Sequence, residues 1–176
     1  ARGYVTTYTY DGFDRLTGMH YPDNTNETLT YDVLGNVLTK QLRDGNTITM
    51  AYDVLNRLET KSPQNLPTVT HTYDLANRPL EISATGKGVV NYVYDTAGRI
   101  TSSSQTIGTN EVAHSIGYEY DAANNRTRVV WPDGYDVNYF YDGANRITSI
   151  EEGSSSTVLA SYTYDALLPR RSSIVY

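Results

Sequence analysis

The chain of 176 residues is long enough for a domain with its own core, and it carries a formal net charge of −6 with an isoelectric point near 4.9. This acidic balance argues against nucleic-acid binding, because affinity for nucleic acid comes largely from neutralising phosphates. Without cysteine the chain can form neither disulfides nor thiolate metal sites. No apolar stretch approaches the roughly 20 residues of a membrane-spanning helix, so no membrane span is predicted.

Tyrosine dominates the aromatic residues, with 17 copies against two phenylalanines and one tryptophan. Tyrosine, threonine and valine suit a half-buried, pleated surface. The composition therefore predicts an all-β fold whose core is built from amphipathic rings.

Tyr-Asp pairs recur along the whole chain. The pairs that define the repeat are Tyr10-Asp11, Tyr31-Asp32, Tyr52-Asp53, Tyr73-Asp74, Tyr94-Asp95, Tyr120-Asp121, Tyr141-Asp142 and Tyr164-Asp165. The first five tyrosines follow one another at intervals of 21 residues, and the later intervals are 26, 21 and 23 residues. A fixed period of this length is typical of repeat proteins, in which each period forms one supersecondary unit. We therefore predict one array of about eight 21-residue units over residues 1–176, with the extra residues in loops.

The residues that precede Tyr-Asp alternate between apolar and polar or small side chains. In one unit Ile48, Met50 and Tyr52 alternate with Thr49 and Ala51. This pattern places one face of a strand against a core and the other in solvent. Strands are predicted at residues 48–52, 69–73, 90–94, 116–120 and 137–141. A second, less regular strand follows each turn, beginning at Leu16, Val37, Leu58, Ile100 or Ile147, and its faces are left unassigned.

Two kinds of turn connect these strands. The position four residues after the tyrosine is glycine or asparagine in most units, namely Gly35, Gly98, Asn56, Asn77, Asn124 and Asn145. Both residue types tolerate a positive φ, so we predict a left-handed residue that closes a hairpin. A second turn leads into the next unit and is marked by segments such as Pro22-Asp23-Asn24 and Pro132-Asp133-Gly134. Two strands from each unit give about 16 in one antiparallel ribbon, which we expect to curve or spiral because sheets beyond about 10 strands curl or split.

The aspartate of each Tyr-Asp pair faces an arginine four residues later in five units. The pairs are Asp11 with Arg15, Asp53 with Arg57, Asp74 with Arg78, Asp95 with Arg99, and Asp142 with Arg146. Acid–base catalysis requires carboxylates in differing environments, whereas these recur in the same context. We therefore interpret them as turn-closing groups that accept backbone N–H bonds and pair with the guanidinium. The tyrosine rings are expected to be largely buried and stacked in register along the ribbon.

The pattern Tyr-Asp-x-x-Gly/Asn-Arg-Ile/Leu-Thr at this spacing resembles the YD repeats of RHS proteins, insecticidal toxin complexes, cell-wall-associated toxins and teneurins. Residues 94–101 and 141–148 match it best, whereas Asn125-Arg126 and the stretch after Asp165 depart from it. The resemblance implies a scaffold without catalytic residues, cofactor or metal, in which hairpins form a shell around a toxin or another polypeptide cargo. It implies a bacterial protein that is secreted or at the cell surface. Because family shells use more repeats, we expect a fragment or a short member.

Two other functions remain as hypotheses. A surface adhesion module would bind carbohydrate or a partner protein through an aromatic face of tyrosine rings or through its edge strands. A hydrolase would have to use the insertion around Thr109, Asn110 and Glu111. A metal site from His20, His71 and His114 is disfavoured because the three lie in different sequence contexts.

The ends of the ribbon are predicted to associate with other strands. The segments Tyr4–Tyr8 and Ser173–Tyr176 carry neither charge nor proline, and unpaired strand edges without such protection are templates for another chain. Edge-to-edge self-association is therefore expected.

Overall fold

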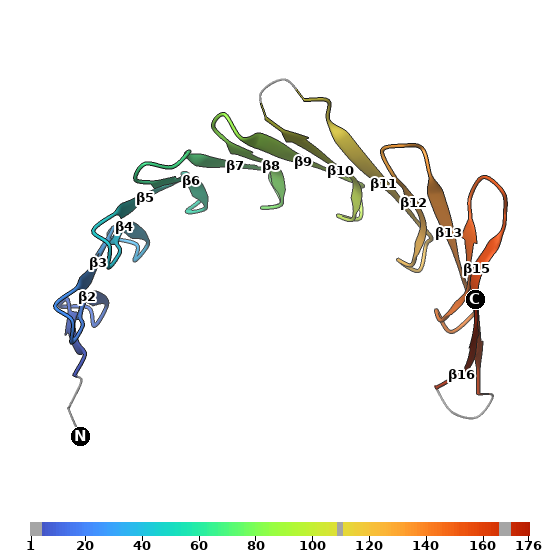
Figure 1. Cartoon of the computed structure of the whole chain (residues 1–176), viewed down its shortest axis with the longest axis horizontal. Coiled ribbons are helices and arrows are strands. Elements are labelled where there is room, and N and C mark those ends of the chain that lie inside the picture. Colours follow the sequence, from blue (N-terminus) through green and yellow to red (C-terminus); the bar gives the residue numbers. More distant parts are fainter. Residues whose placement is uncertain (1–4, 109–110, 166–169) are drawn as a thin grey trace. The chain divides into compact units, whose positions relative to one another are not determined.

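The computed structural model describes residues 5–108, 111–165 and 170–176, which form sixteen strands in one antiparallel order from β1 to β16. The predicted all-β ribbon of hairpins is confirmed (Figure 1). None of the described segments forms a helix with the length and apolar character needed to cross a membrane. Tyr4, Thr109, Asn110 and residues 166–169 lie outside the described residues. That residues 1–176 form one array, and that the ribbon curves or spirals, stay predictions.

The chain divides into two compact units, residues 1–89 and 90–176. The first contains β1 (Thr7–Tyr10), β2 (Leu16–His20), β3 (Asn26–Tyr31), β4 (Val37–Gln41), β5 (Thr47–Tyr52), β6 (Leu58–Pro63), β7 (Val69–Tyr73) and β8 (Pro79–Ala84). Each of these strands is antiparallel to the one that follows it.

β9 (Gly88–Tyr94) begins in the first unit and continues into the second. The second unit then contains β10 (Ile100–Ile107), β11 (His114–Tyr120), β12 (Arg126–Val130), β13 (Asp136–Tyr141), β14 (Ile147–Glu152), β15 (Val158–Tyr164) and β16 (Arg171–Val175). β10 belongs to the unit with the 26-residue interval, and at eight residues it is the longest of the described strands.

Seven of the Tyr-Asp hairpins contain a β-bulge directly beside the turn. In the β5–β6 hairpin Tyr52 pairs with Leu58 but Ala51 pairs with Thr60, so Glu59 is an extra residue on the second strand. The same register shift occurs in the β1–β2, β3–β4, β7–β8, β11–β12, β13–β14 and β15–β16 hairpins. A bulge interrupts the two-residue alternation of faces. This interruption explains why the faces of the second strands could not be assigned from sequence.

The Tyr-Asp turns have the left-handed residue that the sequence predicts. Asn56, Asn77, Asn124 and Asn145 have φ between 60° and 68°, and Gly35 and Gly98 have φ of 93° and 85°. The Asn56 N–H donates to the Asp53 carbonyl at 2.9 Å, and the Asp53 N–H donates to the Arg57 carbonyl at 2.9 Å. A β-turn followed by one left-handed residue is a common three-residue hairpin loop. Asp14 holds the same position at φ 59°, which the sequence analysis missed.

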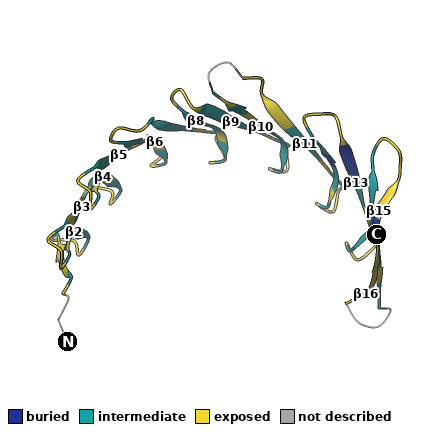
Figure 2. Ribbon diagram, in the orientation of Figure 1, coloured by how far each residue is buried: buried dark blue, intermediate teal, exposed yellow. Residues whose placement is uncertain are grey.

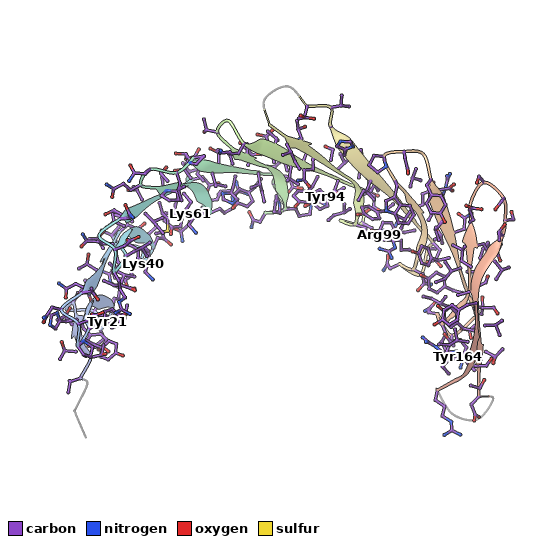
Figure 3. The ribbon with its side chains drawn as sticks, in the orientation of Figure 1. Tyr21, Lys40, Lys61, Tyr94, Arg99 and Tyr164 are labelled. Carbon is purple, nitrogen blue, oxygen red and sulfur yellow. The ribbon has the colours of Figure 1, made fainter. Side chains whose placement is uncertain are left out.

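The sheet is a single layer with little buried core. Among the described residues only Val129, Val137 and Ala160 are buried apolar side chains. Most strand residues are half-buried and the turns are exposed (Figure 2). Within residues 1–89 and within residues 90–176, side chains project from a single layer of strands (Figure 3). The stability of such a sheet must come from contacts between neighbouring strands and turns.

We expect Gly35→Ala to lower the free energy of unfolding by about 1–2 kcal/mol, because an L-residue at positive φ is strained. A Cβ at Gly35 would meet no atom within 4 Å, so steric clash does not contribute. Gly143→Ala is the matched control, since its Cβ also meets no atom within 4 Å and its φ is not in the left-handed range. Urea unfolding of both variants measures the difference; equal stabilities would contradict the strained-turn explanation.

Candidate functional site

The carboxylate of each Tyr-Asp pair closes its own turn. Asp53 Oδ1 accepts hydrogen bonds from the backbone N–H groups of Leu55 and Arg57, both at 2.9 Å, and Oδ2 accepts one from Arg57 Nε at 2.8 Å. The same three bonds occur at Asp11, Asp74, Asp95 and Asp142. In each of these turns, both carboxylate oxygens therefore accept hydrogen bonds that hold the turn together.

Asparagine replaces the arginine in two turns and keeps the bond to the aspartate. Asn36 Nδ2 donates to Asp32 Oδ2 at 2.8 Å, and Asn125 Nδ2 donates to Asp121 Oδ2 at 2.9 Å. The unit with Asn125, which departs from the repeat pattern in sequence, therefore retains the turn geometry.

Hydrogen bonding keeps these carboxyl groups ionised. The side-chain bond from Arg57, followed by its backbone bond, lowers the pKa of Asp53, and the same causes lower the pKa of Asp142. Backbone and side-chain bonds from Arg99 lower the pKa of Asp95. Hydrogen bonds to the charged form of a carboxylate favour that form. These three carboxyl groups are therefore favoured in their charged form.

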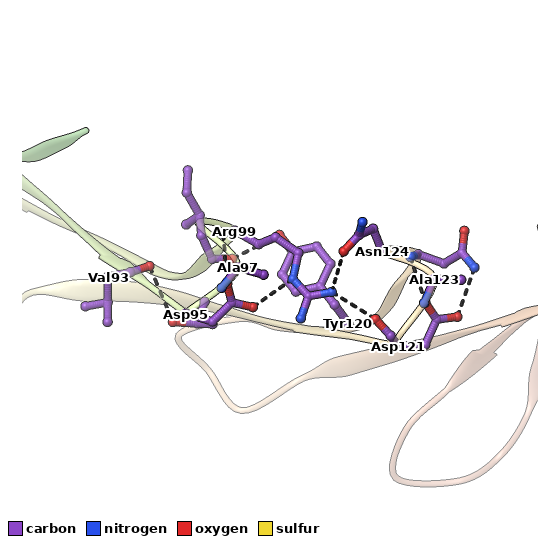
Figure 4. Close-up of polar contacts among 11 residues, drawn as sticks. Val93, Asp95, Ala97, Arg99, Tyr120, Asp121, Ala123 and Asn124 are labelled. Carbon is purple, nitrogen blue, oxygen red and sulfur yellow. Dashed lines mark hydrogen bonds and ion pairs between the residues drawn. The ribbon is translucent and has the colours of Figure 1, made fainter. Parts of the chain in front are cut away.

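Three of these arginines, Arg15, Arg57 and Arg99, also donate hydrogen bonds to the next turn along the ribbon. Arg99 Nη1 donates to the Asp121 carbonyl at 2.8 Å and to Asn124 Oδ1 at 2.9 Å (Figure 4). Arg57 makes the corresponding bonds to the Asp74 carbonyl and to Asn77 Oδ1, both at 2.9 Å. Arg15 donates to the Asp32 carbonyl at 2.9 Å. The asparagines Asn36 and Asn125 reach Asn56 and Asn145 in the same way.

The tyrosine of the next unit receives the same guanidinium on its ring. The Arg57 Cζ lies 4.6 Å from the centroid of the Tyr73 ring, and the Arg99 Cζ lies 4.7 Å from that of Tyr120. Arg15 and Arg146 lie similarly over Tyr31 and Tyr164. A guanidinium over an aromatic face is attracted by the ring quadrupole.

The tyrosine hydroxyls complete the connection by donating to backbone carbonyls of the preceding unit. Tyr73 donates to the Leu58 carbonyl at 2.9 Å. Tyr31, Tyr52, Tyr120, Tyr141 and Tyr164 make the same kind of bond, to the carbonyls of Leu16, Val37, Ile100, Arg126 and Ile147. Together the aspartate, the arginine or asparagine and the next tyrosine form what we call the turn ladder.

The expectation of a core of buried, mutually stacked tyrosines is wrong. The Tyr-Asp rings are half-buried, and Tyr10 is 60% exposed. Four of them pack against arginine, and Tyr73 also stacks on His71 at a centroid distance of 6.5 Å. A one-layer sheet has no opposing layer that would bury the rings, so charged side chains of the neighbouring turn cover them instead.

Other candidate residues are not brought together. No group of three His, Asp or Glu side chains suited to a metal ion occurs in the described part of the chain. Asp165 lies 3.5 Å from Arg170 in the last turn. The sequence analysis recognised the turn asparagines only for their backbone conformation and missed their side-chain role. The recurrence of asparagine at the repeat spacing could have indicated that its side chain has a role in each turn.

Comparison with known families agrees with this geometry. The profile described as the teneurin YD-shell matches residues 59–171, which is more than half of the chain. The chain belongs to the YD-shell family. The RHS repeat profile matches residues 1–25, so the YD-repeat assignment made from sequence is confirmed. No curated protein matches the chain.

Solved structures with the same fold come from toxin complexes. The crystal structure of TcdB2-TccC3-Cdc42 matches 97% of this chain at a TM-score of 0.75 and 18% identity. The Tc holotoxin pore of Photorhabdus luminescens matches 96% at a TM-score of 0.73 and 17% identity. TcdB2-TccC3 without its hypervariable C-terminal region matches 97% at a TM-score of 0.74 and 16% identity. The chain spans about a tenth of the length of these proteins.

The turn carboxylates make the stability of the ribbon depend on pH. The pKa of Asp95 is lowered in the folded chain, so its contribution is present above the unfolded pKa of about 3.9 and is lost as pH falls through the folded value. Asp95→Asn should therefore lower the melting temperature at pH 7, and the difference from the unaltered chain should shrink as the pH falls below about 4. Thermal melts from pH 7 to pH 2 measure it. A pH-independent difference would show that ionisation of Asp95 does not stabilise the turn.

Proposed function

We propose that the chain is a structural repeat module of an RHS-type shell that encloses or presents a toxin or another polypeptide cargo. The turn ladder carries this proposal. It uses the polar groups of the repeated motif in bonds between neighbouring hairpins, as in Arg57 with Asp53, Asp74 and Asn77. A motif whose side chains bind its own neighbours is suited to building a wall rather than to turning over a substrate.

Exposed apolar turn tips support contact with further polypeptide. Val33, Val54 and Leu75 each follow the aspartate of a Tyr-Asp pair directly, and they are 100%, 102% and 99% exposed. The turns of residues 90–176 carry small residues at this position, for example Ala122 and Gly143, so the hairpin itself does not require large apolar side chains there. In two of the turns the next residue, a leucine, is exposed as well, and exposed apolar patches mark interaction sites. The rest of a shell or its cargo would cover them.

The adhesion hypothesis has less support in its original form. It used the Tyr-Asp rings as a binding wall, but Tyr31, Tyr73, Tyr120 and Tyr164 each have a guanidinium over the ring. Their hydroxyl groups already donate to backbone carbonyls. Secretion or display at a bacterial surface is part of the shell proposal, and its support is the similarity in fold to a bacterial Tc holotoxin pore.

Limited trypsin digestion of the natural polypeptide that carries this array tests the enclosing function. We expect the enclosed segment to be cleaved slowly in the unaltered protein. The double variant Arg57→Ala, Arg99→Ala should speed its cleavage at least about tenfold, because two ladder contacts are lost and local opening becomes more frequent.

The matched control is the double variant Lys40→Ala, Lys61→Ala, which also removes two positive charges and two trypsin sites but no ladder contact. It should leave protection unchanged. Rapid cleavage of the entire polypeptide outside the array in the unaltered protein would contradict enclosure.

A further inference from the structure

Two adjoining hollows lie along β9, β10, β11 and the turn between β12 and β13, within residues 90–176. One is lined by His114, Trp131, Pro132 and Asp133 and has a volume of about 360 Å³. The other also measures about 360 Å³ and includes Tyr92, Gln105, His114 and Pro132. They share His114 and Pro132, so we treat them as one surface, the Trp131 hollow. Its size is in the range of small-ligand sites, about 300–1,000 Å³.

The Trp131 hollow has an aromatic wall that no arginine covers. Trp131 lies 5.5 Å from Tyr135, measured between ring centroids, and Tyr135 is 40% exposed. The corresponding turn in residues 1–89 has Tyr21 in place of the tryptophan, and there the Arg43 Cζ lies 4.1 Å from the ring centroid. Arg43 lies 22 residues after Tyr21. The residue at the same spacing after Trp131 is Gly153, which has no side chain to cover the ring. Within the described residues, the tryptophan therefore lacks the cation that occupies its counterpart.

Polar groups around the hollow have hydrogen-bonding capacity to spare. The side chains of Tyr92, Gln105 and His114 donate and accept no hydrogen bond among the described residues. Asp133 uses Oδ1 to accept from the Tyr135 N–H at 3.0 Å, which leaves Oδ2 as an acceptor. The turn ladder, by contrast, uses its polar groups within the protein. Donors and acceptors thus surround an accessible aromatic ring.

The charge of the residues that line the hollow favours a neutral ligand over an anionic one. Its residues include the carboxylate of Asp133 and neither lysine nor arginine. An anionic ligand such as a sulfated or uronic-acid glycan would meet the carboxylate without a compensating cation. A sugar ring offers an apolar face of C–H groups and an edge of hydroxyl groups, which suits an aromatic plane bordered by donors and acceptors.

We propose that the Trp131 hollow binds neutral carbohydrate. A pyranose face packs on Trp131, and its hydroxyl groups bond to Asp133, His114 and Gln105. This site is independent of the turn ladder and of the shell function, because none of its residues belongs to the Tyr-Asp turns.

Tryptophan fluorescence tests the site directly, because Trp131 is the only tryptophan of the chain. The chain is titrated with neutral gluco-, manno- and galacto-oligosaccharides and, separately, with heparin fragments. At least one neutral series should change the emission saturably. Gln105→Ala with His114→Ala should weaken that binding about tenfold or more, which corresponds to the loss of one or two hydrogen bonds.

Tyr21→Ala is the matched control, since it removes the counterpart ring in residues 1–89, and it should leave the affinity unchanged. Trp131→Ala should abolish glycan-array binding while circular dichroism retains the β-sheet spectrum; Trp131→Phe, which keeps an aromatic ring, should retain part of it. The proposal is overturned if no neutral oligosaccharide changes the emission, if heparin fragments alone bind, or if the Gln105, His114 double variant binds as tightly as the unaltered chain.

Discussion

The structure depends on a guanidinium that bonds to two successive turns at once. Arg57 pairs with Asp53 on its own turn, donates to the Asp74 carbonyl on the next and covers the Tyr73 ring. A one-layer sheet whose described residues bury only three apolar side chains cannot rely on a core as a globular domain does. Repetition of this contact provides the connection between hairpins that burial supplies elsewhere.

The ladder links neighbouring hairpins within residues 1–89 and within residues 90–176. Stability of such an array is a sum of unit terms and interface terms between adjacent units. Asparagine at positions 36 and 125 shows that the link tolerates a shorter, uncharged donor, because both the bond to the aspartate and the bond to the next turn persist. What these substitutions give up is the charge and the contact of a guanidinium with the next tyrosine. The contacts between neighbouring hairpins thus share one geometry, and they are stronger where the residue is arginine than where it is asparagine.

The hairpins could be predicted from sequence because their determinants are local. Alternation before Tyr52 and a left-handed residue at Asn56 are properties of a few adjacent positions. The burial of the tyrosines could not be predicted in the same way, because it depends on whether a second layer covers the sheet. The sequence did not predict which side chains of β2, β4 and β6 share a face. Each of these strands has a bulge near its start, and one extra residue reverses the alternation of side chains between the two faces.

The sites of interaction were harder to foresee than the turns. Asn77 and Asn124 receive bonds from Arg57 and Arg99, residues 20 and 25 positions earlier, a relation visible only when the hairpins are placed side by side. The Trp131 hollow includes Gln105 on β10, which at eight residues is the longest of the described strands. Regular spacing predicts the scaffold, whereas departures from it create the local features on which binding depends.

A double-mutant cycle between Arg57 and Tyr73 tests the ladder most directly. Unfolding free energies are measured for Arg57→Met, Tyr73→Leu and the double variant, with Arg57 and Tyr164 as a remote control pair. A contact between the guanidinium and the ring predicts a coupling free energy of about 0.5–1 kcal/mol for the first pair. The control pair should be additive. A coupling of zero between Arg57 and Tyr73 would contradict the claim that arginines join successive hairpins.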